Sequence, residues 1–321
     1  MIHLLAFALG FGMDLLFGDP HGFPHIVVGM GKTIAWLEGI LRGILNKSPK
    51  GERWGGAILA ALLCAFSFGA AHTILGLLRW LHPLLALAAE SFLCWQCLAL
   101  RSLRDESLPV YRALQRGELG AARQALSGIV GRDTQSLDAS GVIRAALETV
   151  AENTTDGVVA PMLFLAIGGA PLGVLYKAIN TMDSMLGYRN EKYLHFGWAA
   201  ARLDDAANFL CARFAALLTV LAAFLSGMDG PNAWRVFCRD RHQHQSPNSA
   251  QTEAACAGAL RVRLGGDALY AGRLVRKPQI GDDGRAVVPK DIQRSHKLLY
   301  AAAFLCFAIC IAAKGAVVFP Q

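Results

Sequence analysis

Residues 55–78 read GGAILAALLCAFSFGAAHTILGLL, a run of 24 residues that carries no formal charge. An α-helix of this length rises about 36 Å, which is enough to cross the ~30 Å hydrocarbon core of a lipid bilayer. The stretch therefore predicts a membrane-spanning helix.

The composition extends this prediction to the whole chain. Of the 321 residues, 54% are hydrophobic and 17% are charged, whereas about 25% of the residues of an ordinary soluble domain are charged. Further candidates for membrane-embedded helices are the apolar segments 1–17, 84–100, 158–175, 206–228 and 298–319. We expect an all-α, polytopic integral membrane protein with about four to six transmembrane or re-entrant helices.

Two polar stretches lie between the apolar segments. Residues 101–157 have helical periodicity, and we expect them to form a helical cytoplasmic insertion in a single membrane-embedded domain of residues 1–321. Residues 229–296 hold 11 Lys/Arg against 7 Asp/Glu, which predicts a basic cytoplasmic loop. The positive-inside rule and the binding of anionic substrates account for this charge, so we do not expect nucleic acid as a partner.

Ionisable residues interrupt several apolar segments, at Asp14, Glu90, Arg213 and Lys314. A charged side chain in lipid is costly, and such residues usually face the interior of a helix bundle or a polar cavity. We expect the same of these four.

Polar and acidic side chains are concentrated between residues 148 and 208. The pattern Asn-Thr-x-Asp occurs at 153–156 and again at 180–183, and Asp204-Asp205-x-x-Asn208 presents the same side chains in reverse order. This repetition indicates a ligand or metal site.

Helical spacing places these carboxylates close together. Glu148, Glu152 and Asp156 share one face of a helix, where like charges repel by roughly 0.2–0.5 kcal/mol per pair. No Lys or Arg lies between Arg144 and Lys177 to neutralise them locally. A hard cation such as Mg²⁺ suits such a ligand set. The alternative is an exposed acidic helix face with Asn caps.

Basic residues accompany the acidic cluster. Lys177, Arg189, Lys192 and Arg202 alternate with its second half, and Arg132 lies in the turn Gly131–Thr134 before its first half. Cations that hold phosphate beside carboxylates that hold metal are typical of phosphoryl chemistry. The alternatives are surface ion pairs, and for Arg132 a simple pair with Asp133.

The first loop also carries candidate site residues. Asp14, Asp19, His21 and His25 fall within twelve residues, in a region rich in Gly and Pro. These groups could contribute to a site at the membrane surface, or form only a Gly-Asp-Pro turn with interfacial histidines.

The basic loop contains Ser246-Pro247-Asn248-Ser249, followed by Glu253. We interpret this as a turn that caps a helix of small residues, which should end at Gly265-Gly266. His242 and His244 are two residues apart and would not share a helix face, so we do not expect them to bind zinc.

The topology sets a constraint. If every apolar segment crosses the membrane, residues 176–205 lie opposite the loops 18–54, 101–157 and 229–296, and the acidic cluster is divided. Segment 158–175 has only 18 residues and contains two prolines and a Gly-Gly pair. We therefore predict that it is re-entrant or a broken helix and turns back, with segment 206–228 also returning.

These motifs, in this order, resemble those of the CobD/CbiB family of cobalamin-biosynthesis membrane proteins, the cobinamide-phosphate synthases. The resemblance covers nearly the whole chain and rests on Gly18 to His25, Gly131–Thr134, Glu148–Asp156 with Pro161, Tyr176–Tyr188, Ala201–Asn208, and Ser246–Gly266 with Lys277-Pro278. The chain departs from the family pattern at Cys211, where a proline is expected, and at Ala250–Thr252, where a Gly-Trp-Pro-like run is expected.

The resemblance implies an ATP-dependent amide ligase. It would join adenosylcobyric acid to (R)-1-amino-2-propanol O-2-phosphate, giving adenosylcobinamide phosphate, with ATP and Mg²⁺ required. On this hypothesis the Mg²⁺ ligands are Asp19, Glu152, Asp156, Asp183, Asp204 and Asp205. The phosphate-binding residues are Arg132, Lys177 and Arg202, substrate is oriented by Asn153, Asn180 and Asn208, and the candidate bases are His25 and Glu148.

The same resemblance implies a multi-pass protein of the bacterial inner membrane with its active site facing the cytoplasm. Its partners would be the lipid bilayer, the corrinoid and the aminopropanol phosphate, with a homo-oligomer or other late pathway enzymes as further possibilities. Two other classes of protein remain open: a Mg²⁺-dependent membrane phosphotransferase or prenyltransferase, and a transporter with a polar site at the bilayer midplane.

Overall fold

The computed structural model describes residues 2–20, 22–270 and 272–318. Met1, His21 and Phe319, which belong to the segments discussed above, lie outside these ranges. The helices are α1 (Ile2–Phe17), α2 (Ile26–Ile44), α3 (Pro49–Leu81), α4 (Pro83–Cys97), α5 (Leu100–Gln115), α6 (Leu119–Ser127), α7 (Ala139–Asn153), the π-helix η1 (Thr154–Val159), α8 (Ala160–Leu186), α9 (Trp198–Leu225), α10 (Gly230–Asp240), α11 (Ser249–Leu260) and α12 (Lys290–Val318).

The predicted all-α class is confirmed. The exceptions among the described residues are four strands of three residues each: β1 (Arg263–Gly265), β2 (Ala268–Tyr270), β3 (Arg273–Val275) and β4 (Gln279–Gly281). β1 pairs with β4, and β2 pairs with β3, both antiparallel.

The predicted multi-pass membrane character is confirmed as well. Five helical stretches of the described chain are long and apolar enough to cross a membrane: 49–81, 83–115, 139–186, 198–225 and 290–316. Each contains one of the predicted apolar segments or most of it, whereas α1 has only 16 residues.

Helix α3 shows why its sequence forms a long helix. Ser48 caps its N-terminus by accepting a hydrogen bond from Gly51 N, and proline occupies the first turn, where its missing N–H costs nothing. Trp54 and Trp80, near the two ends, are 61% and 84% exposed. Amphipathic Trp side chains at both ends of an apolar helix are typical of the two membrane–water interfaces.

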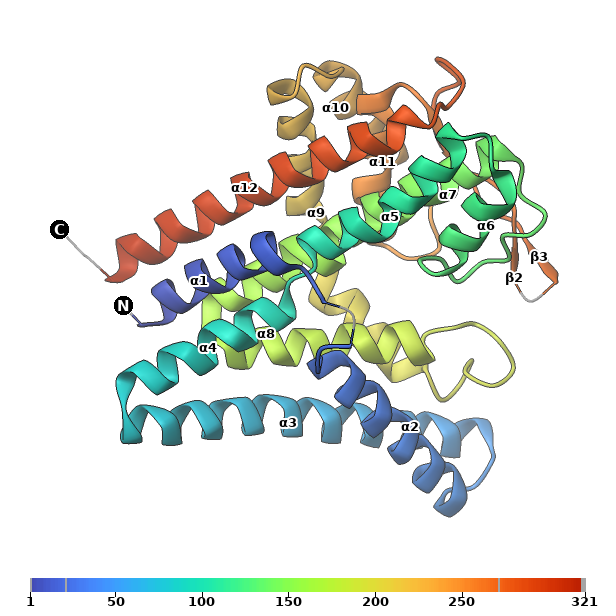
Figure 1. Cartoon of the computed structure of the whole chain (residues 1–321). Coiled ribbons are helices and arrows are strands. Elements are labelled where there is room, and N and C mark those ends of the chain that lie inside the picture. Colours follow the sequence, from blue (N-terminus) through green and yellow to red (C-terminus); the bar gives the residue numbers. More distant parts are fainter. Residues whose placement is uncertain (1, 21, 271, 319–321) are drawn as a thin grey trace. The chain divides into compact units, whose positions relative to one another are not determined.

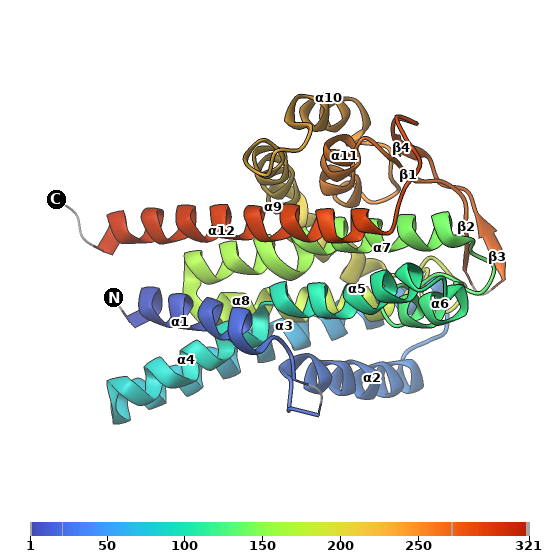
Figure 2. The same ribbon diagram turned by 45° about the horizontal axis from the view of Figure 1, so that its top comes forward.

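The helices are grouped into two compact units. The first unit comprises the chain up to Ala99, Pro161–Asn208, and the end of α12 from Cys310. In it α1 packs alongside α4, and α3 packs against both α4 and α2 (Figures 1 and 2). Gly10 permits the closest approach of α1 and α4, because a Cβ there would lie 2.4 Å from Cβ of Cys94.

Helix α8 is broken at Gly168 and Gly169, and Gly169 has φ 67° and ψ −164°, a conformation almost restricted to glycine. The chain reverses here. The rings of Phe164 and Tyr176 lie 4.9 Å apart, and a Cβ on Gly173 would lie 2.3 Å from Leu165. Residues eight and twelve positions apart could not touch along one straight helix. The prediction that this run turns back is confirmed.

Charged side chains form hydrogen bonds with the backbone at the apex of this hairpin. Glu90, which is fully buried, accepts hydrogen bonds from Ala170 N (3.4 Å) and from His3 Nδ1 (2.5 Å). Lys314 Nζ donates to the carbonyl oxygens of Ala166 (2.8 Å) and Leu165 (3.4 Å). The carboxylate of Glu90 thus lies at the N-terminal end of the second helical arm, and the ammonium of Lys314 lies at the C-terminal end of the first arm. Both placements are favourable for the helix dipoles.

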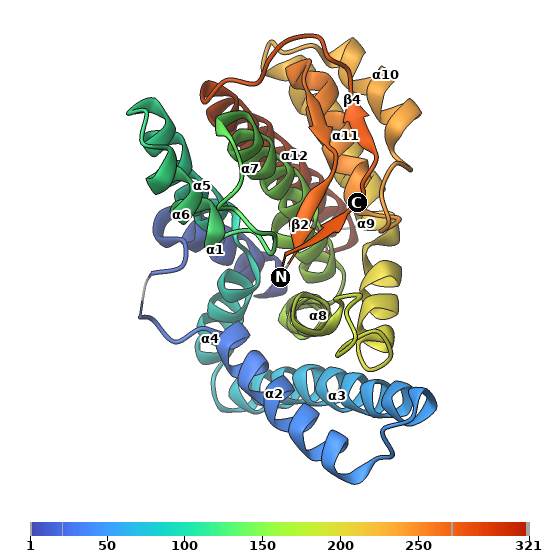
Figure 3. The same cartoon turned by 90° about the vertical axis from the view of Figure 1, so that its right-hand side faces the viewer.

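The second unit comprises Leu100–Ala160 and Phe209–Ile309. Helices α5, α6 and α7 pack together, and α11 packs against α7, α10, β1 and β4 (Figure 3). All twelve residues of α11 are buried, and most of them are small. Gly258 lets α11 approach α10, since a Cβ there would lie 2.6 Å from the carbonyl oxygen of Asn232.

One predicted boundary is wrong. Helix α11 ends at Leu260, where Arg261 adopts a left-handed conformation, rather than at Gly265-Gly266. The residues in between form β1, whose pairing with β4 provides the hydrogen bonds that a longer helix would have provided.

Candidate functional site

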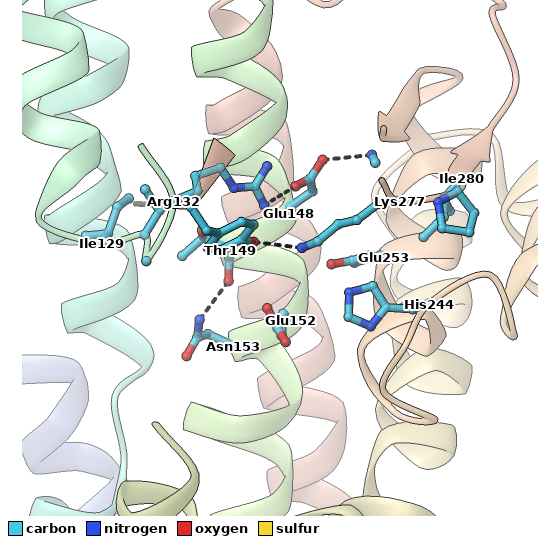
Figure 4. A pocket seen from close by; sticks show the side chains of 15 residues that line it. Ile129, Arg132, Glu148, Thr149, Glu152, Asn153, His244, Glu253, Lys277 and Ile280 are labelled. Carbon is cyan, nitrogen blue, oxygen red and sulfur yellow. Dashed lines mark hydrogen bonds and ion pairs between the residues drawn. The ribbon is translucent and has the colours of Figure 1, made fainter. Parts of the chain in front are cut away.

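The second unit contains a pocket of about 210 Å³ between α7, α11 and the loops around the β-strands (Figure 4). Its ionisable lining residues are Arg132, Glu148, Glu152, His244, Glu253, Tyr270 and Lys277. The pocket is smaller than the roughly 300–1,000 Å³ typical of drug-sized ligands. Its size and charge fit a compact ionic group.

Arg132 and Glu148 form a buried ion pair on one wall. Arg132 Nη2 lies 2.5 Å from Glu148 Oε2, and Gly265 N donates to Glu148 Oε1 at 2.7 Å. Burial on its own would lower the pKa of Arg132, but the charge and hydrogen bond of Glu148, together with the charges of Tyr270 and Glu253, outweigh burial and raise that pKa. Arg132 therefore supplies the positive charge that the sequence between residues 144 and 177 lacks, and it pairs with Glu148 rather than with Asp133.

Glu253, on α11, is 5% exposed and faces two other carboxylates. Burial, followed by the charges of Glu148 and Glu152, raises the pKa of Glu253 well above its ordinary value. Glu152 is hydrogen-bonded to Ser249, whose Oγ donates to Glu152 Oε1 at 2.8 Å. Three carboxyl groups thus share the pocket in different environments, a common way to separate acid and base roles.

His244 lies next to Glu253 in Figure 4. Burial lowers the pKa of His244, so the ring is neutral near pH 7. Ser246 N donates to His244 Nδ1 at 3.0 Å, which places the single ring proton on Nε2. In this tautomer His244 is a hydrogen-bond donor to a ligand rather than a base.

Lys277 extends across the pocket (Figure 4), and its Nζ donates to the hydroxyl oxygen of Tyr270 at 2.7 Å. Within the described part of the chain, no carboxylate lies at ion-pair distance from this ammonium. Its positive charge is therefore available to an anionic ligand.

Of the predicted site residues, the structure brings four together in this pocket: Arg132, Glu148, Glu152 and Asn153. Asp156 does not line it. The predicted stripe of Glu148, Glu152 and Asp156 is interrupted because α7 gives way to η1 at Thr154, and the wider π-helical turn changes the direction of the following side chains.

The other predicted residues belong to the first unit, in smaller groups. His25 caps α2 through Nδ1, which accepts from Val27 N, and its Nε2 lies 3.4 Å from Asp19. Asn208 accepts a hydrogen bond from Tyr176 and donates one to Asp204, and Arg202 lies near Asp205. Lys177, Asn180 and Asp183 follow one another along the second arm of α8. Their predicted roles stay predictions.

Sequence reasoning missed His244, Glu253, Tyr270 and Lys277. Glu253 was interpreted only as part of a helix cap, and His244 was considered only for zinc. The available signal was the proximity of both to Ser246–Ser249 in a loop rich in Arg and Lys.

Among the residues that the structure describes, no three His, Cys, Asp or Glu side chains are close enough to form a metal centre made by protein alone. Mg²⁺ seldom requires one, because it usually keeps several waters and is held by one or two carboxylates together with substrate phosphates. Glu152 offers such a carboxylate. Asn153 donates its amide nitrogen to Thr149 O, which leaves its amide oxygen for a ligand.

Fold and site together define a multi-pass membrane protein with a small, charged pocket. The CobD/Cbib protein family model matches residues 7–299. The chain belongs to the CobD/CbiB family.

Several proteins with curated names align with this chain over almost the full length of both sequences. The cobalamin biosynthesis protein CobD of Geobacter metallireducens is 50% identical over 301 residues, which are 94% of this chain and 93% of that protein. The CobD protein of Klebsiella pneumoniae is 44% identical and the CbiB protein of Salmonella typhimurium 42% identical, each over 97% of both chains. No solved structure matches the chain.

Proposed function

We propose that this protein is an ATP-dependent amide ligase of cobalamin biosynthesis. It joins the propionate carboxylate of adenosylcobyric acid to the amine of (R)-1-amino-2-propanol O-2-phosphate and gives adenosylcobinamide phosphate. The observation that carries the proposal is the pocket of the second unit, which combines the cations of Arg132 and Lys277 with three carboxyl groups in different environments. The family, whose relatives are named cobalamin biosynthesis proteins, supplies the pathway.

The chemistry explains why such a pocket is needed. A carboxylate is a poor electrophile and becomes reactive after phosphoryl or adenylyl transfer from ATP. The amine nitrogen then attacks the carbonyl carbon, a C–N bond forms, and the C–O bond to phosphate or AMP breaks. Both steps develop negative charge on phosphate oxygens, and the attacking amine must lose one proton to a base as the amide forms.

The cations and hydrogen-bond donors of the pocket can bind the phosphate groups of the substrates. Lys277 has no carboxylate partner in the described part of the chain, and Arg132 is held in place by Glu148. The Nε2 proton of His244 adds a neutral donor. We assign these three residues to phosphate binding.

Glu253 suits the role of base. The raised pKa of its carboxyl group makes its ionised form a stronger base than that of an ordinary glutamate, which is favourable for proton transfer. Glu148, by contrast, has both oxygens engaged by Arg132 and Gly265. We therefore assign Glu148 to positioning Arg132, and Glu253 rather than Glu148 or His25 to accepting the proton of the amine.

Mg²⁺ fits the remaining groups. The carboxylate of Glu152 and the amide oxygen of Asn153 would hold it beside the phosphates. When bound, the ion would neutralise phosphate charge during transfer.

The pocket's size bears on which substrate it holds. About 210 Å³ accommodates a compact amino alcohol phosphate but not a corrin macrocycle. Only the reacting propionate arm of the corrinoid would enter. Because ATP is cytoplasmic and residues 229–296 carry an excess of Lys and Arg, we propose that the pocket faces the cytoplasm from the inner membrane.

The test uses the purified full-length protein with adenosylcobyric acid, aminopropanol phosphate and Mg·ATP, with the corrinoid amide followed by mass spectrometry. Lys277→Met should lower the rate about a hundredfold or more, because a phosphate-binding charge is lost. Arg276→Gln, an exposed neighbour, is the matched control and should leave the rate unchanged. A folded preparation that forms no amide and turns over no ATP would refute the proposal.

A further inference from the structure

Two arginines of the second unit carry charges that no carboxylate among the described residues neutralises. Arg213 lies on α9, and Arg241 directly follows α10. Within the described ranges, no carboxylate lies at ion-pair distance from either guanidinium. The two groups are also near enough to repel each other. A pair of unneutralised cations costs free energy unless an anion from outside the chain joins them.

Their hydrogen bonds leave donors unused. Nη1 of Arg213 donates to the carbonyl oxygen of Phe209 (2.5 Å) and to Oδ1 of Asn248 (3.4 Å), and its guanidinium stacks 3.6 Å from the Phe209 ring centroid. Arg241 lies over the ring of Phe237, and its Nε is buried without an acceptor. A buried donor without a partner costs about 1–3 kcal/mol. An oxyanion between the two residues would provide the acceptors.

The N-terminus of α11 reaches the same place. Asn248 precedes the helix but does not cap it with its side chain; its amide oxygen accepts from Arg213 instead. One turn further, Gln251 Nε2 donates to the carbonyl oxygen of Arg241 at 3.1 Å. The partial positive charge of this helix end adds to the two guanidinium groups. Guanidinium groups bind phosphate in a bidentate manner, so the combination favours phosphate.

The position of Arg213 indicates the source of that phosphate. Along α9 it falls in line with Leu210, Leu217 and Leu221, which are 74%, 46% and 43% exposed. The 15 residues from Phe214 to Met228 carry no charge. Arg213 is the last charged residue of α9 before this uncharged stretch, and we place it at the level of the phospholipid headgroups.

We propose that Arg213, Arg241 and the N-terminal turn of α11 form a binding site for a phosphate group, supplied by the headgroup of an anionic membrane phospholipid. Neither arginine lines the pocket described above, so this site is separate from it and does not rest on the proposed ligase function. Its lipid would join α9 to the loop that precedes α11 at the membrane surface.

The test uses the full-length protein purified in non-ionic detergent. Phosphatidylglycerol or phosphatidylcholine is added, and retained lipid is measured by native mass spectrometry alongside the thermal unfolding temperature. We expect phosphatidylglycerol to be retained and to stabilise the protein, and Arg213→Gln or Arg241→Gln to weaken retention about tenfold. Arg235→Gln, on α10 and paired with Asp282, is the matched control and should behave like wild type.

A lysine variant and inorganic phosphate are added to the experiment to separate the possible outcomes. Arg241→Lys keeps the charge without the bidentate geometry and should retain part of the binding, which keeps the test valid if Arg241→Gln does not fold. If inorganic phosphate stabilises wild type but not the glutamine variants, and phosphatidylglycerol does not, the site binds a soluble phosphate and the lipid source is refuted. Equal retention by wild type and both glutamine variants, with no effect of inorganic phosphate, would overturn the site itself.

Discussion

Replacing Gly169 by alanine tests the structure of the α8 hairpin. The added Cβ would lie 2.6 Å from Oε1 of Glu90 and 2.9 Å from Nδ1 of His3, closer than van der Waals contact allows. The backbone conformation of Gly169 also costs about 1–3 kcal/mol for any other residue. If Glu90 moves away, its bonds to Ala170 and His3 are lost, at roughly 1–3 kcal/mol. We therefore expect a loss of about 2–6 kcal/mol in the free energy of unfolding.

The assay is thermal unfolding of the purified protein in detergent, followed by Trp fluorescence. Gly169→Ala should unfold several degrees below wild type. Gly76→Ala on α3, where a Cβ meets nothing within 4 Å, is the matched control and should be neutral or slightly stabilising. In the double variant Gly169→Ala/Glu90→Ala the contact between the added Cβ and Glu90 is absent, so the loss of stability should be smaller than the sum of the single losses. If Gly169→Ala unfolds at the wild-type temperature, the hairpin apex is not built as described.

Further predictions concern the pocket. Arg132→Ala should lower the free energy of unfolding by about 3–5 kcal/mol, because it leaves Glu148 as a buried unpaired charge. The control Arg116→Ala breaks an exposed ion pair and should change the unfolding temperature little. Equal effects of the two substitutions would contradict the buried ion pair. Glu253 holds its proton more tightly in the folded protein than in the unfolded chain, so above pH 4.5, where an ordinary glutamate ionises, its contribution to stability falls as pH rises. The unfolding temperature of Glu253→Gln relative to wild type should therefore increase with pH, and a difference independent of pH would show that the pKa of Glu253 is not raised.

The hairpin could be predicted from the sequence because its cause is local. Gly168-Gly169 and two prolines interrupt a run of 18 residues, and both residue types disrupt a helix through their own backbone geometry. The α3 span was predictable for the same kind of reason, since its length and lack of charge are properties of one continuous segment.

The pocket depends on contacts that no local pattern encodes. Glu148 binds Arg132 across 16 positions of the chain and Gly265 across 117. Helical periodicity correctly placed Glu148 and Glu152 together, but it assumed 3.6 residues per turn throughout. The π-helical turn from Thr154 to Val159 violates that assumption and removes Asp156 from the pocket.

The ionisable residues of the apolar helices differ in whether protein groups balance their charges. Glu90 and Lys314 looked equally costly in the sequence, yet the structure matches each with a helix end exposed by the break in α8. Their charges are used inside the protein. Among the residues that the structure describes, Arg213 has two neutral acceptors, Phe209 O and Asn248 Oδ1, and a second arginine nearby. The described protein groups balance the charges of Glu90 and Lys314 but not that of Arg213. We therefore expect the partner of Arg213 in the membrane.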